Sequence, residues 1–395
     1  VYKRQCKGVP KSNCLTKEQR LSLQMDEFMN RRYEFRYNTQ IGEVEYRERF
    51  SFRFYFHPID KRAQNSIMLD AQSEGIGVWD RDIDRYLHSN RVPIYNPLEE
   101  FLFHLPHWDG KDRIHALANR VPCNNPHWEL LFHRWFLNMV SHWRGVNKMY
   151  ANSTSPILVG AQGTHKSTFC REMIPPALRA YYTDSIDFSQ KRDAELYLNR
   201  FALINIDEFD QITLTQQGFL KHILQKPVVN LRKPHGRSVL ELQRYASFIG
   251  TSNQKDLLTD PSGSRRFICI EVTGNIDTTQ PIDYEQLYAQ AMHEISHGER
   301  YWFNSEDEQI MTENNREFEQ TPAMLQLFYQ YFRAPQAGEE GEFFTPVEIL
   351  NYLKKKSGIS LSDNKVYHFG RMLQKCGITS KHTYKGTVYQ VVKIL

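Results

Sequence analysis

The chain has 395 residues, 40% hydrophobic and 13% aromatic, which allows two or three domains with real cores and excludes a largely disordered protein. Its 50 basic and 46 acidic residues give a net charge of +4, too small to indicate a nucleic-acid partner by itself. Six scattered cysteines without a C-x-x-C motif predict reduced thiols of a cytoplasmic protein. No apolar run approaches the roughly 18 residues of a membrane span, and the start VYKRQCKGVP is unlike a signal peptide. Because this start lacks methionine, we expect the chain to be part of a longer one.

The first segment, residues 1–62, is predicted to contain a helix and a β-hairpin. Thr16 to Glu18 is a suitable start for a helix over residues 15–31. Residues 33–50 alternate apolar and charged side chains around a turn at Gly42, which is typical of a hairpin.

A helical region is predicted for residues 63–148. From Trp128 to Trp143 its large apolar residues recur every three to four positions. This aromatic stripe favours a buried core over a base-stacking platform.

The segment LVGAQGTHKST, Leu158 to Thr168, is close to the phosphate-binding motif G-x-x-x-x-G-K-[ST]. It follows the apolar run PILVG and precedes a helical pattern, which is the context that the motif requires. Backbone N–H groups of such a loop attract phosphate oxygens, so we predict that Lys166 reaches the β- and γ-phosphates of ATP and that Ser167 binds Mg²⁺. The predicted nucleotide-binding residues are Gly160, Gln162, Gly163, Thr164, His165, Lys166, Ser167 and Thr168.

His165 stands where the motif has its second glycine. If the backbone φ angle there is positive, a histidine costs about 1–3 kcal/mol; if it is negative, the cost is small. The sequence leaves this choice open. Because the other elements of the motif are present, we expect the site to bind ATP.

Two later apolar runs end in polar residues. In FALINIDEFD the apolar run ends at Asp207 and Glu208. A Mg²⁺ ion held partly by Asp207, with Glu208 polarising the attacking water, would explain carboxylates at the end of a buried strand. YASFIGTSN ends in Asn253, whose amide could orient the lytic water or sense the γ-phosphate. Residues 149–305 therefore predict an α/β P-loop ATPase.

A pair of arginines, Arg265 and Arg266, lies between a glycine turn and a further strand, in GSRRFICIEV. A guanidinium group can stabilise the charge of a phosphoryl-transfer transition state, often from a neighbouring subunit. One of the pair could instead form a structural salt bridge. The sequence does not decide which arginine stabilises the transition state and which forms the salt bridge, and we slightly prefer Arg265 for the catalytic role.

A basic turn, RKPHGR, lies between two β-rich arms in residues 228–247. Its basic and imidazole side chains suit the phosphates of single-stranded DNA, although a solvated basic turn would look the same. The candidate DNA-binding residues are Arg232, Lys233, His235 and Arg237.

The last segment follows a predicted helical connection over residues 306–335 and an expected exposed linker over residues 332–344. Residues 343–395 contain nine lysines and arginines against two acidic residues, and two helical patterns precede an alternating stretch that turns at Lys385-Gly386. This order predicts a winged helix. DNA binding and simple packing on the ATPase remain equally open for it.

Together these motifs resemble AAA+-type NTPases, and most of all the superfamily 3 helicase-like domain of the virulence-associated protein E family. The resemblance rests on VGAQGTHKST, INIDEFD, KPHGRSVLELQRYASFIGTSN and GSRRFICIEV, and upstream on LPHWDGKDRIHALA, which is similar to a segment that precedes the ATPase in that family. It covers residues 80 to 305. The basic C-terminal segment looks like the extra domain of some Bacteroidetes-type relatives.

The resemblance implies an ATPase of a phage or mobile element that acts on single-stranded DNA in replication, with the basic turn in the pore of a ring, which we expect to be a hexamer, and a primase as partner. His104, His107 and His115 do not make metal-binding spacing with a carboxylate, so we expect no metal beyond the Mg²⁺ of the nucleotide. Two other interpretations remain: an ATP-dependent switch that binds a replication or host protein without unwinding DNA, and a winged-helix DNA-binding regulator whose P-loop is degenerate at His165.

Overall fold

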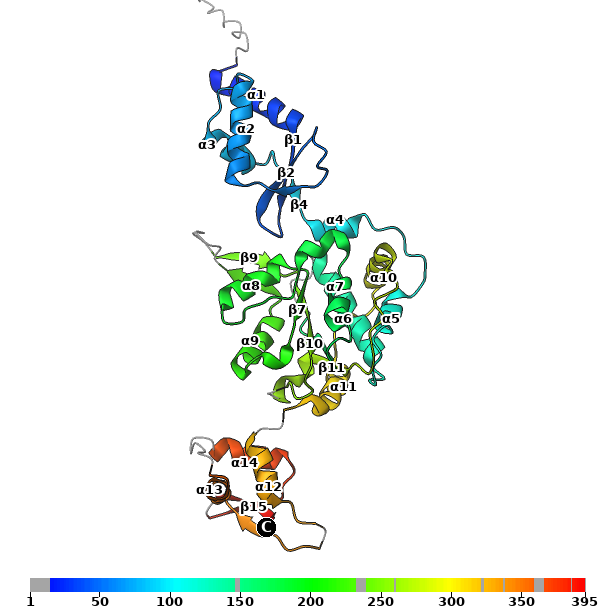
Figure 1. Cartoon of the computed structure of the whole chain (residues 1–395), viewed down its shortest axis with the longest axis vertical. Helices are drawn as coiled ribbons and strands as arrows, with labels where there is room; N and C mark the ends of the chain where they lie inside the picture. The colour runs from blue at the N-terminus through cyan, green and yellow to red at the C-terminus, as the bar shows by residue number, and fades with distance from the viewer. Residues whose placement is uncertain are drawn as a thin grey trace, which may run out of the picture.

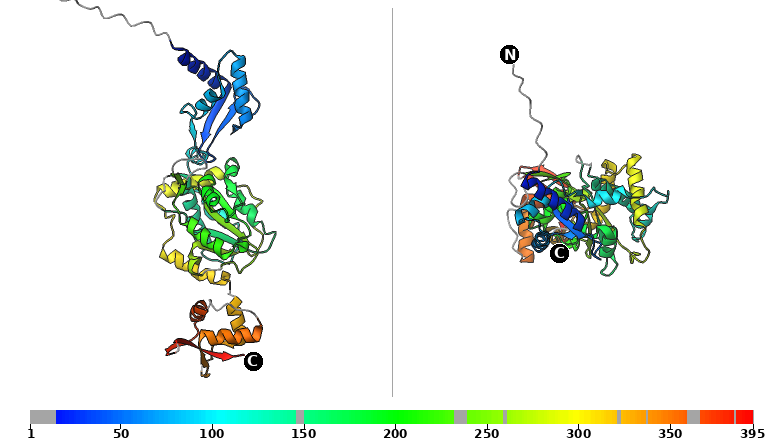
Figure 2. Two further views of the ribbon diagram at one scale, coloured as in Figure 1. Left: turned by 90° about the vertical axis from the view of Figure 1, so that its left-hand side faces the viewer. Right: turned by 90° about the horizontal axis from the view of Figure 1, so that it is seen from above.

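A computed structural model shows three units along the long axis of the molecule (Figures 1 and 2). Within its described ranges, no helix combines the length and the apolarity that a membrane crossing requires. The structure describes residues 15–145, 150–231, 239–258, 261–320, 323–336, 338–358, 366–384 and 386–394.

The N-terminal unit is a small antiparallel sheet, extended by one parallel strand and packed against three helices. Helix α1 begins as predicted at Thr16, which forms a capping box with Gln19, and the predicted hairpin turns at Gly42 with a φ of 72°. One apolar cluster runs from Met25 to Val92, so it crosses the predicted division at residue 62. The elements are α1 (Lys17–Arg32), β1 (Tyr33–Asn38), β2 (Glu43–Glu48), β3 (His57–Pro58), α2 (Lys61–Ser73), α3 (Asp80–Leu87) and β4 (Ile94–Tyr95), with strand order β3-β2-β1-β4.

The central unit is a mixed α/β structure around a five-stranded sheet in which every pairing is parallel. The strand order is β11-β5-β10-β7-β6, so β5 and β7 are separated by β10. The strands are β5 (Ser155–Val159), β6 (Tyr182–Thr183), β7 (Leu203–Ile206), β10 (Ser247–Ser252) and β11 (Phe267–Glu271). Four of them are the strands predicted from apolar runs, whereas the two-residue β6 is not apparent in the sequence.

Two apolar clusters cover the two faces of this sheet, because successive side chains of a strand point to opposite faces. Leu158 belongs to one cluster, and its neighbours Ile157 and Val159 belong to the other. The helices of this unit are α4 (Pro97–Phe103), α5 (Arg113–Ala118), α6 (Trp128–Trp143), α7 (Lys166–Glu172), α8 (Lys191–Arg200), α9 (Leu214–Leu224), α10 (Tyr284–Ser296) and α11 (Ser305–Asn315), with 3-10 turns at Pro176–Tyr181, Phe209–Gln211, Pro261–Arg266 and Arg316–Phe318.

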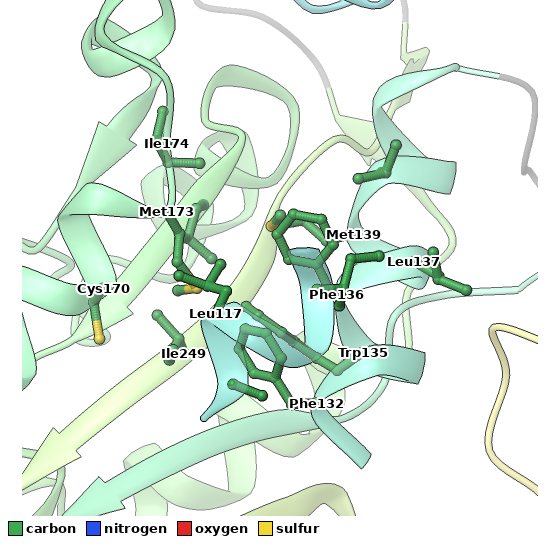
Figure 3. Packing of buried hydrophobic residues seen from close by; sticks show 14 of the residues in the cluster. Leu117, Phe132, Trp135, Phe136, Leu137, Met139, Cys170, Met173, Ile174 and Ile249 are labelled. Atoms are coloured by element: carbon green, nitrogen blue, oxygen red, sulfur yellow. The ribbon is translucent and has the colours of Figure 1, made fainter. Parts of the chain in front are cut away.

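Helix α6 contains the aromatic stripe, and the structure confirms it as core. Phe132, Trp135 and Phe136 are fully buried, and they gather with Leu117 of α5 and Ile249 of β10 (Figure 3). A helix that is apolar on nearly all sides belongs inside a protein. It leaves no ring free to stack on a base.

The C-terminal unit has its own apolar cluster, which includes Leu325, Phe328 and Phe332. The expected exposed linker over residues 332–344 is wrong at both ends, because Phe332 pairs with Lys393 and Phe343 pairs with Gln390. The elements are α12 (Ala323–Tyr331), β12 (Phe332–Arg333), β13 (Glu342–Phe344), α13 (Pro346–Ser357), α14 (Val366–Lys375), β14 (Ser380–Thr383) and β15 (Gly386–Lys393), and β15 pairs antiparallel with the other three strands.

Candidate functional site

A cavity of about 320 Å³ lies at the carboxyl ends of β5, β7 and β10. Carboxyl ends of parallel strands are where ligands bind in open α/β sheets. The predicted loop, the predicted carboxylates and the predicted amide meet here. The lining residues are Gln162, Gly163, Thr164, His165, Lys166, Ser167, Thr168, Asp207, Glu208, Thr251 and Asn253.

The loop between β5 and α7 is held by one hydrogen bond within the loop and by another from a distant segment of the chain. The Thr164 hydroxyl donates to the Ala161 carbonyl at 2.9 Å, and the Ile276 N–H donates to the Thr164 carbonyl at 3.1 Å. Gly160 does not line the cavity; instead, a Cβ there would lie 3.0 Å from the Val272 carbonyl oxygen. The glycine at 160 is therefore needed for close packing of the loop on the strand beside it.

His165 adopts a left-handed conformation, with φ of 66° and ψ of 21°. This settles the choice that the sequence left open, since a non-glycine residue in this region costs of order 1–3 kcal/mol. The first helical bond of α7 runs from the Phe169 N–H to the His165 carbonyl, so the amides of Lys166, Ser167 and Thr168 precede the bonded turn. The loop thus places backbone donors beside the cavity.

Lys166 is buried at the inner end of the loop, where its ammonium group meets neutral oxygens. It donates to the carbonyls of Gly160 and Ala161, both at 2.8 Å, and to the Asn253 side-chain oxygen at 3.2 Å. Burial lowers the pKa of the Lys166 ammonium, and the nearby Asp207 carboxylate partly opposes this. The hydrogen-bond partners of the Lys166 ammonium are thus neutral, although the Asp207 carboxylate lies near enough to act on its pKa.

Asp207 and Glu208 follow β7 directly, and both line the cavity. One oxygen of Asp207 accepts hydrogen bonds from the Ser167 hydroxyl, at 3.0 Å, and from the Thr251 hydroxyl. Glu208 is the other non-glycine residue with a positive φ among those described, at 52°. This backbone turn aims two successive carboxylates at one cavity.

Asn253 lies at the same end of the sheet, just beyond β10, as the sequence predicts. Thr251 also lines the cavity, and sequence reasoning missed it. The signal was present: positions 251 and 253 are two apart at the end of a strand, and alternate residues share a face.

A magnesium ion fits the donor set of this cavity only in part. Ser167 and Asp207 supply hard oxygens 3.0 Å apart, the type of ligand that Mg²⁺ prefers. Among the described residues, no three His, Cys, Asp or Glu side chains are grouped to hold a metal alone. This pattern suits an ion that shares its ligands with substrate phosphates.

Arg265 and Arg266 do not line this cavity. The Arg265 guanidinium donates to the Glu308 carboxylate at 2.7 Å and borders a separate hollow of about 400 Å³ against α11. The N-terminal end of the following strand is fixed nearby by Asn315, which donates to the carbonyls of Ser264 and Phe267. The structure therefore separates the predicted arginines from the other predicted catalytic residues.

The arms of the predicted hairpin are strands β8 (Val228–Leu231) and β9 (Leu240–Gln243), which pair antiparallel. The tip residues Arg232, Lys233, His235 and Arg237 lie outside the described residues.

Arg244, which follows β9, fixes the base of the hairpin. Its guanidinium is fully buried and donates to five backbone carbonyls, and burial lowers its pKa to about 9. Those carbonyls belong to residues 152, 223, 224, 226 and 246. This role could not be predicted from the sequence, because an arginine between strands ordinarily indicates a surface position.

A family model described as the virulence-associated protein E-like domain matches residues 102–320. A second model, described as a domain of unknown function from B. Theta, matches residues 321–391. Their border separates Phe318 of the central clusters from Leu325 of the C-terminal cluster.

Two solved structures of the NrS-1 C-terminal region are similar to this chain. The apo structure (305–718) has a TM-score of 0.47, and the A form apo structure has a TM-score of 0.46. Each is 11% identical in sequence, and each match covers 94% of this chain and 98% of the NrS-1 chain. At this TM-score the likeness supports no statement about chemistry. No curated protein matches the chain.

Proposed function

The chain belongs to the virulence-associated protein E-like family, and from its site we propose that it binds ATP with Mg²⁺ and hydrolyses it. One observation supports this above all: Lys166 and Ser167 at the start of α7, Asp207 after β7 and Asn253 after β10 line one cavity. A cavity of about 320 Å³ with convergent polar groups suits a small ligand.

The binding part of the site is the loop of residues 160–168. Its amides and the Lys166 ammonium hold the phosphates, and Lys166 exchanges its neutral carbonyl partners for phosphate oxygens. Ser167 and Asp207 would hold Mg²⁺, which when bound neutralises charge on the phosphates.

The hydrolytic part consists of Glu208 and Asn253. Glu208 accepts the proton of the attacking water, and Asn253 orients that water or senses the γ-phosphate. Asn253 already bonds to Lys166 at 3.2 Å, so a phosphate that recruits Lys166 frees the amide oxygen for a new partner.

Arg265 or Arg266 completes the site from a second copy of the chain. Neither lines the cavity of its own chain, so a contribution to the transition state requires a neighbour to present it. A closed ring, which we propose to be a hexamer, gives every cavity such a neighbour.

The wider proposal is an ATP-driven helicase or translocase that acts on single-stranded DNA during replication of a phage or mobile element, together with a primase. The basic turn at the end of β8 and β9 would contact the DNA backbone, and the C-terminal unit, with two helices before the β14–β15 pair, would act as a winged helix. A strand-displacement assay on forked DNA separates this function from that of a nucleotide-dependent switch.

The test of the core proposal is ATP hydrolysis by the purified chain with and without single-stranded DNA, compared with Lys166→Ala. We expect DNA to stimulate hydrolysis and Lys166→Ala to reduce it to background, because the phosphates lose their principal cation. Lys226→Ala is the matched control, since Lys226 pairs with Glu195 away from the cavity. Equal hydrolysis by Lys166→Ala and the unaltered chain would refute the proposal.

A further inference from the structure

The loop between β2 and β3 places several large aromatic side chains in solvent. Residues 49–56 have the sequence RFSFRFYF, here termed the aromatic loop. Phe50 is 87% exposed, Phe52 96%, Phe54 77% and Tyr55 66%. A monomeric protein rarely leaves so many rings in water within one loop, which indicates a ligand for them.

These exposed rings are separate from one another. Among the described residues, Phe50, Phe52 and Phe54 make no ring–ring contact, and of the exposed four only Tyr55 meets a ring, that of His57 at 6.3 Å. A protein-binding surface gathers its apolar groups into a continuous core. Rings held apart, with Ser51 and Arg53 between them, instead offer individual flat faces.

The inner end of the loop already stacks planar cations on rings. The Arg36 guanidinium lies 4.0 Å from the Phe56 ring centre and 3.7 Å from that of Tyr95, and Arg47 lies 4.8 Å from that of Phe56. Arg47 also donates to the Phe54 carbonyl at 2.9 Å. This bond holds the loop backbone in place before any ligand arrives, which lowers the ordering cost of binding.

The charges beside the loop favour an anionic ligand. Arg47 and Arg49 share one carboxylate, that of Glu34, and Arg36 pairs with Glu45. Arg53 is exposed in the middle of the loop and takes part in no ion pair within the described ranges. Glu48 and Asp60, which act on Tyr46 together with Arg53, balance the arginines around the loop, so Arg53 is the cation that the loop itself offers to an anion.

We propose that the aromatic loop binds single-stranded nucleic acid, with bases stacked on Phe50, Phe52 and Phe54 and a phosphate held by Arg53. Stacking of bases on separate aromatic rings, with arginines along the backbone, is how proteins hold single strands without reading their sequence. The loop lies outside residues 102–320, so this surface is additional to the basic turn of the central unit. It also does not depend on ATP hydrolysis.

The test is fluorescence anisotropy of a labelled DNA single strand of about 20 nucleotides, longer than the site of one binding module. The unaltered chain is compared with a Phe52→Ala/Phe54→Ala double variant in the absence of nucleotide. We expect the double variant to bind at least about tenfold more weakly, and a Phe52→Trp/Phe54→Trp variant to recover the affinity, because stacking needs a ring. An RNA strand of the same sequence, measured alongside, shows which nucleic acid the loop prefers.

Two controls separate this surface from others. Phe103→Ala removes a ring that is 83% exposed on α4 and should leave the affinity unchanged. Lys233→Ala/Arg237→Ala alters the basic turn, so its loss of affinity should add to that of the loop variant.

Arg53→Ala should lower the salt dependence of binding, whereas the phenylalanine variants should not.

Equal DNA affinity of the double alanine variant and the unaltered chain would overturn the proposal. If that variant also sediments as a smaller species, the loop is a contact between copies of the chain instead. Background ATP hydrolysis in every variant would refute the proposed enzymatic function and leave this inference standing, because it is measured without nucleotide.

Discussion

Lys166 and Arg265 are both cations of the central unit, but their surroundings are opposite. Lys166 is buried, and its ammonium is held by two backbone carbonyls, a hydroxyl and an amide oxygen. Arg265 is 47% exposed and forms an ion pair with Glu308. Lys166 borders the cavity at the end of the sheet, whereas Arg265 borders a separate hollow.

This difference indicates that the two cations serve different steps, Lys166 in binding the nucleotide and Arg265 in its hydrolysis. The groups that we propose to bind the nucleotide line one cavity within one chain, where the ends of neighbouring strands fix them. The arginine is held by an exposed carboxylate, and an exposed ion pair contributes little stability, so it can be broken at low cost. A single copy should therefore bind nucleotide, and hydrolysis should need a second copy.

The largest effect that tests this comparison is expected for Arg265→Ala. Hydrolysis should fall by on the order of 10³-fold while ATP affinity stays unchanged, because the transition state loses a cation that the bound substrate does not need. Steady-state hydrolysis and calorimetric titration measure the two properties. Arg266→Ala, measured in parallel, identifies which arginine acts.

Mixing decides whether the arginine acts across copies. Arg265→Ala and Lys166→Ala are each expected to be inactive, but a mixed assembly would pair an intact cavity with a neighbour's intact Arg265. Partial recovery of hydrolysis is expected on mixing. If hydrolysis does not recover at any mixing ratio, in assemblies shown to contain both variants, Arg265 does not act across copies.

A smaller effect, a loss of about 10²-fold in hydrolysis, is expected for Glu208→Gln. The amide cannot accept a proton from water, but it has nearly the same shape, so ATP should still bind. Single-turnover hydrolysis measures the chemical step directly. Asp210→Asn is the matched control, because Asp210 bonds to Ser252 and does not line the cavity; an equal loss there would assign no special role to Glu208.

The smallest effect is expected for His165→Gly. Relief of the left-handed backbone should raise the free energy of unfolding by about 1 kcal/mol, after the greater freedom of glycine in the unfolded chain offsets part of the gain. Denaturant unfolding without nucleotide measures it. Thr164→Gly, whose φ is not positive, should instead lower stability. A loss of stability in His165→Gly would show that the imidazole contributes more than the strain costs.

Much of the central unit could be predicted from the sequence because it depends on local patterns. Four strands are apolar runs with polar ends, and parallel pairing brings those ends together, which is why the sequence predicts that Lys166, Asp207 and Asn253 lie at one site and the structure places all three along one cavity. The left-handed angles of His165 could not be predicted, because the loop next to it is bonded, through Thr164, to Ile276 more than a hundred residues later. The pairing of Arg265 with Glu308 is also a long-range contact without a local signal.

The structure of the N- and C-terminal units was harder to predict, because it also depends on long-range contacts. Phe332 and Phe343 lie next to proline, glycine and glutamate residues, which predict a linker, but they pair with β15 some fifty to sixty residues later. In the N-terminal unit, α2 and α3 pack on the same core as the hairpin, and only the tertiary contacts show it. The sequence does not distinguish the exposed rings of the aromatic loop from core residues, because composition does not show which apolar side chains meet water.

Helix α6 has a practical consequence for any attempt to isolate the sheet. A truncated protein beginning at residue 149 would retain every strand of the central sheet, yet lose the helix that covers Leu158, Ile249 and Ile270. It would also lose the segment around Pro122, whose carbonyl accepts the Thr273 N–H at 2.8 Å. Thr273 directly follows Val272, the residue against which Gly160 packs. Such a fragment should aggregate through its exposed apolar face, so a shortened protein has to begin before α4, whose Leu98 and Leu102 belong to the same cluster.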